Sequence, residues 1–258
     1  MTATAYSVPD HIPPIVRLEL ERRRAWLEKV PEVERAARWA AIVADACSEL
    51  QQLDRYEIPR AYRDACPEGA RDPDAFNKVL AHDGTKTAKP GLILFGDTGS
   101  GKTSAAYARI IRRLLDADHE FITHINAADL ALMVRGSASN FNEFSRILRF
   151  LCGRDTEEDT ETDDDVTARW FSCSGLLIDD LHVPRFTDAY ARALYQIVEA
   201  RTADRDELIL TCQTDAVGLM KKWRTDAPEL ADTAKAIVRR IVDFCTPINF
   251  IWEDSPWE

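Results

Sequence analysis

The chain has 258 residues, an apolar fraction of 45% and a formal net charge of -11. This length allows one large domain or a core domain with a smaller appendage, and the composition is that of an ordinary globular protein. The acidic balance argues against a strong, sequence-independent grip on nucleic acid, which usually requires clustered Lys and Arg. No apolar run approaches the roughly 20 residues that cross a bilayer, and residues 1–14 lack the pattern of a secretory signal. We therefore expect a cytoplasmic protein with no membrane partner.

Cysteines and acidic residues are distributed in ways that exclude some sites and indicate a loop. The six cysteines are widely spaced, so zinc knuckles and redox CxxC pairs are excluded. Eight Asp and Glu residues lie between positions 155 and 165. Such a block is usually a solvated loop, and we expect one over residues 154–166. The rest of the chain is close to neutral, which leaves room for a local basic groove.

The first 90 residues divide into a helical part and a connection. Apolar side chains recur at helical spacing over residues 12–53, and Pro31 is placed to begin a second helix. Residues 64–90 are rich in Pro, Gly, Asp and Lys, which favours an extended connection at the surface. We therefore expect three parts: an N-terminal helical, partner-binding domain (1–55), a linker and lead-in (56–90) and a core (91–258).

From position 91 onward, short apolar runs alternate with amphipathic segments. We expect five strands, at residues 92–95, 121–125, 176–178, 208–210 and 248–251. We expect helices at residues 102–116, 127–134, 139–152, 187–201, 214–223 and 231–243. Because strands alternate with helices, the pattern predicts an α/β fold with a five-stranded parallel sheet covered by helices on both faces.

Between the first strand and the first helix of the core lies a glycine-rich segment of the form G-x-x-x-x-G-K-T. Backbone N–H groups of such a loop, together with the positive end of the following helix, bind the phosphates of ATP. The lysine reaches the β- and γ-phosphates, and the threonine hydroxyl ligates Mg²⁺. The segment consists of Gly96, Asp97, Thr98, Gly99, Ser100, Gly101, Lys102 and Thr103.

Two carboxylates follow the third predicted strand, at the edge of the sheet where ligands of open α/β folds bind. Asp179 is placed to bind Mg²⁺, most simply through water, and Asp180 to orient or deprotonate the attacking water. A solvated strand end or a helix cap is the alternative for Asp180. Together with the phosphate loop, the pair predicts an ATP-hydrolysing site.

Two further positions are candidates for that site. The fourth predicted strand ends in Thr-Cys-Gln-Thr, where a polar side chain could position water; Gln213 is the first choice and Thr211 the second. Ordinary turn chemistry is the alternative. Arg239 and Arg240 close a helix before the last strand, where arginine either stabilises a transferring phosphoryl group or stabilises a helix C-terminus.

In order and spacing, these features resemble the AAA+ ATPases of the DnaC/IstB type, which are bacterial and phage helicase loaders and transposition helper ATPases. The resemblance covers roughly residues 56–254. Besides the phosphate loop and the acid pair with Leu181, it rests on segments 57–65, 126–130, 198–201, 209–213, 238–241 and 250–255.

The resemblance implies roles for several residues. Gln213 falls at the family's sensor 1 asparagine, Arg240 falls at the arginine finger that acts on a neighbouring subunit, and Ile58 to Tyr62 would cover the adenine. The sequence departs from the family in having Gln at sensor 1 and an acidic insertion. A cis-acting sensor 2 arginine and a C-terminal lid domain are not visible.

The resemblance implies a slow ATPase, with ATP and Mg²⁺ as its ligands, that acts as a helicase loader in DNA replication. Its N-terminal helices would bind a hexameric replicative helicase, and the chain would self-associate through the ATP site with Arg240 in trans. Contact with single-stranded DNA would be weak. Alternatives are an IstB-like transposition helper and an ATP-dependent binding module with little turnover. A small-molecule kinase is disfavoured, because neither an arginine-rich lid nor an acceptor pocket is evident.

Overall fold

The computed structural model describes residue 8 and residues 12–53, 58–84, 87–116, 121–136, 141–153 and 173–251. The acidic loop expected at residues 154–166 lies outside these ranges. Within them, none of the helices combines the length and the apolar character that a membrane crossing requires.

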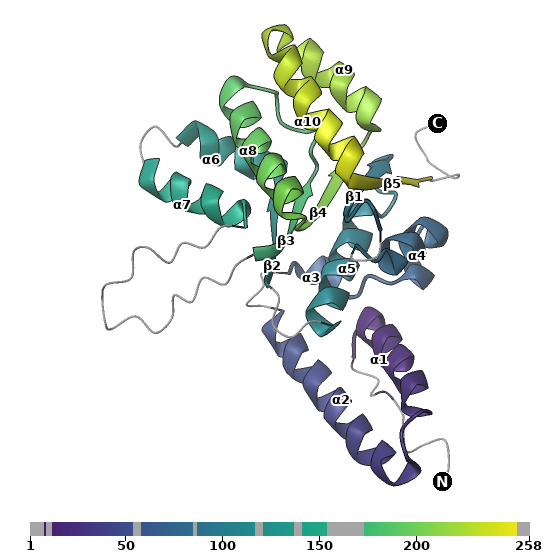
Figure 1. The fold of residues 1–258 in the computed structure, drawn as a ribbon. Coiled ribbons are helices and arrows are strands. Elements are labelled where there is room, and N and C mark those ends of the chain that lie inside the picture. The colour runs from purple at the N-terminus through teal and green to yellow at the C-terminus, as the bar shows by residue number, and fades with distance from the viewer. Residues whose placement is uncertain are drawn as a thin grey trace, which may run out of the picture.

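A five-stranded, all-parallel sheet forms the centre of the molecule, as the alternation of strands and helices predicted. The strand order is β2-β3-β4-β1-β5 (Figure 1). Strands β1, β3 and β4 are therefore neighbours, and their carboxyl ends meet at one edge of the sheet. The strands are β1 (Gly91–Gly96), β2 (Phe121–Asn126), β3 (Cys173–Asp179), β4 (Glu207–Cys212) and β5 (Cys245–Phe250).

Helices cover both faces of this sheet. The core helices are α5 (Lys102–Asp116), α6 (Ala127–Gly136), α7 (Phe141–Leu151), α8 (Asp188–Asp204), α9 (Ala216–Asp226) and α10 (Ala231–Phe244). The N-terminal helices are α1 (Pro14–Leu27), α2 (Glu32–Gln52), α3 (Arg60–Arg63) and α4 (Pro73–Ala81). The described residues also include the short 3-10 turns Pro67–Gly69 and Pro228–Leu230.

Alternate residues of the central strands face different helices, which explains their continuous apolar sequences. In β4, Ile209 packs in the cluster that contains α1, α4 and α5, whereas Leu208 and Leu210 pack in the cluster of α6 to α10. All three side chains are buried. Burial of each such side chain stabilises the fold by roughly 1.5–3 kcal/mol, so the sheet is held from both sides.

The N-terminal helices are not detached from the core. Helix α1 packs on α5, and its buried Ile15 and Leu20 belong to the same hydrophobic cluster as Ile110 of α5. The buried carboxylate of Glu19 also meets Arg112 of α5 at 3.4 Å. Removal of α1 would therefore expose an apolar face of α5.

The prediction of an extended surface connection over residues 64–90 is wrong for α4. Asp72 caps this helix, because its Oδ1 accepts the N–H of Ala75 at 2.9 Å, and Pro73 occupies the first turn. Apolar side chains then follow at helical spacing and pack against the core; they are Phe76, Val79 and Leu80.

Two residues before α4 join the lead-in to the edge of the sheet. Asp72 uses its second oxygen, Oδ2, to accept the N–H of Ile251 at 2.9 Å, just after β5. Arg71 donates from Nη1 to the carbonyl of Gly99 at 2.9 Å, in the loop after β1. The lead-in is therefore bonded to two segments at the carboxyl edge of the sheet.

Candidate nucleotide-binding site

The loop between β1 and α5 has a backbone that requires glycine. Gly96, Gly99 and Gly101 have φ values of 139°, 80° and 102°, which L side chains rarely adopt. At Gly96 a Cβ atom would also lie 2.1 Å from the carbonyl oxygen of Phe250. The spacing of glycines in the motif thus corresponds to real conformational demands.

Lys102 begins α5 and is turned back over the loop. Its Nζ donates to the carbonyls of Gly96 at 2.7 Å and Asp97 at 2.6 Å, and the residue is only 6% exposed. Burial lowers the pKa of Lys102, while the nearby carboxylate of Asp180 raises it. Phosphate oxygens are charged acceptors and bind an ammonium more strongly than carbonyls do, so this environment suits a triphosphate.

Thr103 and Asp179, the two expected Mg²⁺ ligands, lie side by side. The Thr103 hydroxyl donates to Asp179 Oδ1 at 3.0 Å, and the Thr211 hydroxyl donates to the same oxygen at 2.5 Å. Burial raises the pKa of Asp179, whereas these hydrogen bonds lower it. Neither this site nor any other part of the described ranges holds a group of three His, Cys, Asp or Glu side chains that could bind a metal ion. The pair fits Mg²⁺, which takes most of its ligands from phosphate and water.

Asp180 occupies an uncommon backbone conformation with φ 58°. Its N–H donates to Thr211 Oγ1 at 2.8 Å, and the next N–H, of Leu181, donates to the Thr211 carbonyl at 2.9 Å. A non-glycine residue in this region costs of order 1–3 kcal/mol and persists only where its surroundings hold it. Here the end of β4 holds it, with Asp180 lining the cleft beside the phosphate loop.

Gln213 reaches the phosphate loop from the segment after β4. Its side-chain Nε2 donates to Thr98 Oγ1, and its backbone N–H donates to Nδ1 of His182 at 3.2 Å. The structure therefore places Gln213 against the phosphate loop, and its role in positioning water stays a prediction.

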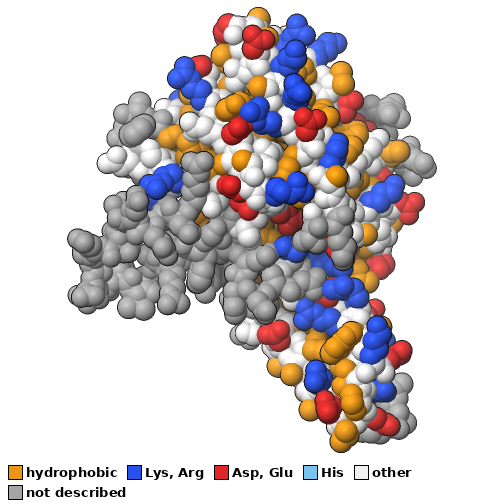
Figure 2. All heavy atoms as spheres, viewed as in Figure 1, with side chains coloured by type: hydrophobic (Ala, Val, Ile, Leu, Met, Phe, Trp, Pro, Cys, Tyr) orange, Lys and Arg blue, Asp and Glu red, His pale blue; other side chains and the backbone are white. Residues whose placement is uncertain are grey.

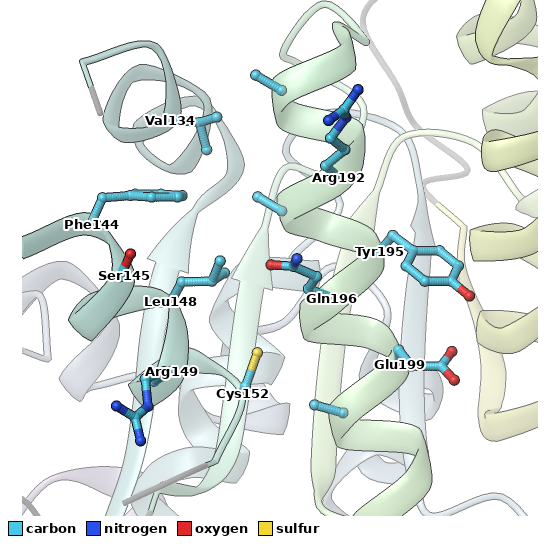
Figure 3. Close-up of a pocket in the computed structure, with 13 residues that line it drawn as sticks. Val134, Phe144, Ser145, Leu148, Arg149, Cys152, Arg192, Tyr195, Gln196 and Glu199 are labelled. Atoms are coloured by element: carbon cyan, nitrogen blue, oxygen red, sulfur yellow. The ribbon is translucent and has the colours of Figure 1, made fainter. Parts of the chain in front are cut away.

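Lys102, Thr103, Asp180 and Gln213 line one cavity of about 460 Å³, within the size range of small-molecule sites. A larger cavity of about 710 Å³ lies between α7 and α8 (Figure 3), but it has neither the phosphate loop nor the acid pair. We therefore assign the chemistry to the smaller cavity. It is lined by Tyr62, Thr98, Gly99, Gly101, Lys102, Thr103, Ser104, Asp180, His182, Val183 and Gln213.

Of the two residues named for the adenine, the structure brings Tyr62 to the cavity. Its ring stacks on Tyr107 with centroids 4.6 Å apart and planes 8° apart. Burial raises the pKa of Tyr62, so the phenol stays neutral. Ile58 is instead buried in the hydrophobic core with α1, α4 and α5.

Arg240 lies on α10 and is not among the described residues that line the cavity. It forms an ion pair with Glu199 of α8 and donates to the Tyr195 hydroxyl at 3.1 Å. Its guanidinium also lies 4.8 Å from the centroid of the Tyr195 ring. Figure 3 shows both of these partners on α8. The position is compatible with action on another copy, and that role stays a prediction.

Three features of the site were missed by the sequence reasoning. Thr211 was considered only as a residue that positions water, yet it is fully buried and bonds both carboxylate residues. The sequence predicts no role in this site for His182 or for the Tyr62–Tyr107 stack. The sequence gives one usable signal, since His182 lies three positions after Asp179, on the segment that leaves the same sheet edge.

No family model matches the chain, and no curated protein matches it. Solved structures do resemble it. A candidate primosome component from Streptococcus pyogenes serotype M3 is 18% identical, with 75% of this chain and 90% of that chain covered and a TM-score of 0.51. The DnaI structure is 19% identical, with 69% and 81% covered and a TM-score of 0.48. The DnaC helicase loader is 14% identical, with 69% and 86% covered and a TM-score of 0.47.

At these identities the likeness concerns the fold alone, and the streptococcal structure carries that argument because its TM-score exceeds 0.5. In this chain the parallel sheet, the phosphate loop after β1 and the helices on both faces are the features of an α/β P-loop NTPase fold. The chain therefore has an α/β P-loop NTPase fold like that of the streptococcal protein, as the resemblance to DnaC-like AAA+ proteins implied.

Proposed function

We propose that this chain is an ATPase of the AAA+ type that uses Mg²⁺. The observation that carries the proposal is that Lys102, Thr103, Asp180 and Gln213 line one cleft, with Asp179 hydrogen-bonded to Thr103 beside them. These groups come from three neighbouring strand ends, and together they supply a phosphate cradle, ion ligands and a base.

The geometry supports a separate role for each of these residues. Lys102 and the loop N–H groups bind the β- and γ-phosphates, and Thr103 with Asp179 holds Mg²⁺, which when bound neutralises phosphate charge. Asp180 accepts the proton of the attacking water. Gln213, whose side chain donates to Thr98 of the phosphate loop, orients that water. The products are ADP and inorganic phosphate.

Asp180→Asn tests this assignment, with ATP binding measured by calorimetry and turnover by phosphate release. We expect nearly unchanged ATP affinity and a loss of turnover, because the amide cannot accept the proton. Asp204→Asn, on the exposed end of α8, is the control and should leave both quantities unchanged. A wild-type protein that fails to bind ATP would contradict the proposal.

We further propose that the ATPase acts as a helicase loader, delivering a hexameric replicative helicase to single-stranded DNA with ATP as the switch. The sequence resemblance supports this, and the streptococcal protein of like fold is described as a primosome component. The N-terminal helices offer exposed apolar side chains among charged ones (Figure 2). Trp26 is 49% and Val33 89% exposed.

The test is binding to a purified hexameric replicative helicase in the presence of a non-hydrolysable ATP analogue. Because α1 covers an apolar face of α5, point substitutions are sharper than truncation of residues 1–55. The double variant Trp26→Ala, Val33→Ala should no longer capture the helicase. Lys29→Ala changes an exposed residue in the turn between α1 and α2 and should leave capture of the helicase unchanged. Equal capture by all three proteins, or no capture by the wild type, would overturn the loader proposal but not the ATPase.

A second candidate, an ATP-dependent binding module with little turnover, is favoured by one observation. The Gln213 amide is hydrogen-bonded to Thr98 and Arg240 is paired with Glu199, so two residues expected to act in hydrolysis have partners already. Tight ATP binding with undetectable phosphate release by the wild-type protein would support this reading.

A further inference from the structure

His182 stands on the wall of the nucleotide cleft, three residues after Asp179. The residue is 9% exposed, and it lines the same cavity as Lys102, Asp180 and Gln213. Its Nδ1 lies 3.2 Å from the backbone nitrogen of Gln213, with the hydrogen-bond geometry of an N–H donor and a ring acceptor.

This hydrogen bond determines which ring nitrogen carries the proton. A backbone N–H can only donate, so Nδ1 must present its lone pair, and the neutral imidazole then carries its proton on Nε2. Burial lowers the pKa of His182, as do Lys102 and Lys222, whereas Asp180 and Asp179 raise it. Within the described part of the chain the ring makes no other hydrogen bond. Its Nε2–H group is therefore available to donate to a bound ligand.

We propose that His182 binds the terminal phosphate of the bound nucleotide and so detects its presence. Its Nδ1 fixes the backbone of Gln213, and its Nε2–H donates to an oxygen of the γ-phosphate. The inference rests on the proposed ATP site and deepens it, since it assigns a residue that distinguishes ATP from ADP. Because ADP lacks the γ-phosphate, the contact from Nε2 exists with ATP alone.

The position of His182 also connects the γ-phosphate contact to helix α8 and, through α8, to Arg240. The chain runs from His182 through Val183 to Thr187, which caps α8 by accepting the N–H of Tyr190. Helix α8 carries Tyr195 and Glu199, which hold Arg240. A shift of His182 toward the γ-phosphate therefore acts on Gln213 directly and on the α8 start through five residues.

Two near-isosteric variants separate the functions of the two nitrogens. In His182→Asn the side-chain oxygen replaces the Nδ1 acceptor but supplies no donor at the Nε2 position. In His182→Gln the side-chain amide supplies a donor near the Nε2 position but no acceptor at Nδ1. ATP and ADP affinities are measured by calorimetry, and melting temperatures establish that each variant is folded.

We expect His182→Asn to bind ADP as the wild type does and to lose about tenfold or more in its preference for ATP, as for a hydrogen bond to a charged group. His182→Gln should retain most of that preference. An unchanged preference in His182→Asn overturns the inference, while the ATPase proposal survives because ATP still binds. Failure of the wild type to bind ATP would defeat both, and is thereby distinguished from failure of His182 alone.

A second readout needs no variant. In the nucleotide-free protein with ¹⁵N-labelled histidine, NMR should show Nδ1 of His182 unprotonated and Nε2 protonated. A non-hydrolysable ATP analogue should shift the Nε2 resonance, and ADP should leave it unmoved. A proton on Nδ1, or equal shifts with both nucleotides, would overturn the proposal even if a variant did not fold.

Discussion

Thr211 binds Asp179 across the β3–β4 pair, with Oγ1 2.5 Å from Oδ1, and the same hydroxyl accepts the N–H of Asp180. One buried side chain therefore sets both members of the acid pair. Thr103 of α5 donates to the same Asp179 oxygen at 3.0 Å. The carboxylate of Asp179 is therefore held between β4, which carries Thr211, and α5, which follows the phosphate loop.

Thr211→Val keeps the shape of the side chain and removes the hydroxyl. The N–H of Asp180 then has no acceptor, which should cost about 1–3 kcal/mol of unfolding free energy. ATP turnover should fall as well, because Asp180 is no longer held in its left-handed conformation. Urea unfolding and phosphate release measure the two effects. Thr211→Ser retains the hydroxyl and is the control; equal behaviour of Val and Ser would contradict the role.

Asp179→Asn should stabilise the protein without nucleotide. Burial raises the pKa of Asp179 in the folded state, so the ionised carboxylate costs stability at any pH above that raised value. The cost vanishes below the unfolded pKa of about 3.9, where both states hold the proton, and it grows as the pH rises between the two pKa values.

Near neutral pH, with EDTA present, the melting temperature of Asp179→Asn should exceed that of the wild type by about 2 °C. The gain should shrink as the pH is lowered toward about 4. Addition of Mg²⁺ and ATP should stabilise the wild type more than the variant, because the amide is a poorer ligand. A lower melting temperature for the variant without nucleotide would refute the argument.

Lys102→Ala should weaken ATP binding by about tenfold to a hundredfold, the equivalent of one strong charge-assisted hydrogen bond. The measurement is calorimetric titration with ATP and Mg²⁺. Lys78→Ala, on the exposed side of α4, removes the same charge away from the cleft and should leave the affinity unchanged. Unaltered affinity in Lys102→Ala would remove the lysine from the site.

Arg240→Ala should abolish turnover and leave ATP binding nearly intact if the arginine acts on a neighbouring copy. Arg239→Ala is the matched control, since Arg239 is exposed and pairs only weakly with Asp243 at 3.7 Å. Mixing Arg240→Ala with Lys102→Ala protein should restore part of the activity, because some interfaces then join an intact finger to an intact phosphate loop. No recovery on mixing, or an equal loss of ATP binding in Arg240→Ala, would count against action in trans.

Most of the core was predictable because its strands are buried on both faces. A continuous apolar run such as residues 92–95 is hard to place anywhere else in an α/β chain. Strand β5 begins three residues before its predicted start at Ile248, because Pro247 interrupts the strand pattern in the sequence. A proline is tolerated there because, among the described strands, β5 lies at the edge of the sheet and pairs with β1 alone.

Helix α4 was not predicted, because the composition of its segment differs from that of a typical helix. The overall content of Pro, Gly and Asp over residues 64–90 suggested a connection, yet Asp72 and Pro73 are the residues that begin a helix. The local order of these residues carried information that their composition concealed.

In the site, the phosphate loop and acid pair could be predicted because their chemistry is contiguous in sequence. The hydrogen bonds from Gln213 to Thr98 and His182 join segments that are distant in sequence, so the spacing of residues along the chain could not predict them.

The paired contacts made by Arg71 and Asp72 have a mechanical consequence. The lead-in from the N-terminal helices is tied at Asp72 to the end of β5 and at Arg71 to Gly99 of the phosphate loop. Besides the direct packing of α1 on α5, the N-terminal helices are therefore connected to the predicted phosphate loop through these two adjacent residues. If the N-terminal helices bind a partner as proposed, a displacement of residues 71 and 72 would move the same loop backbone that the proposed ATP site uses, and the two binding events would be coupled.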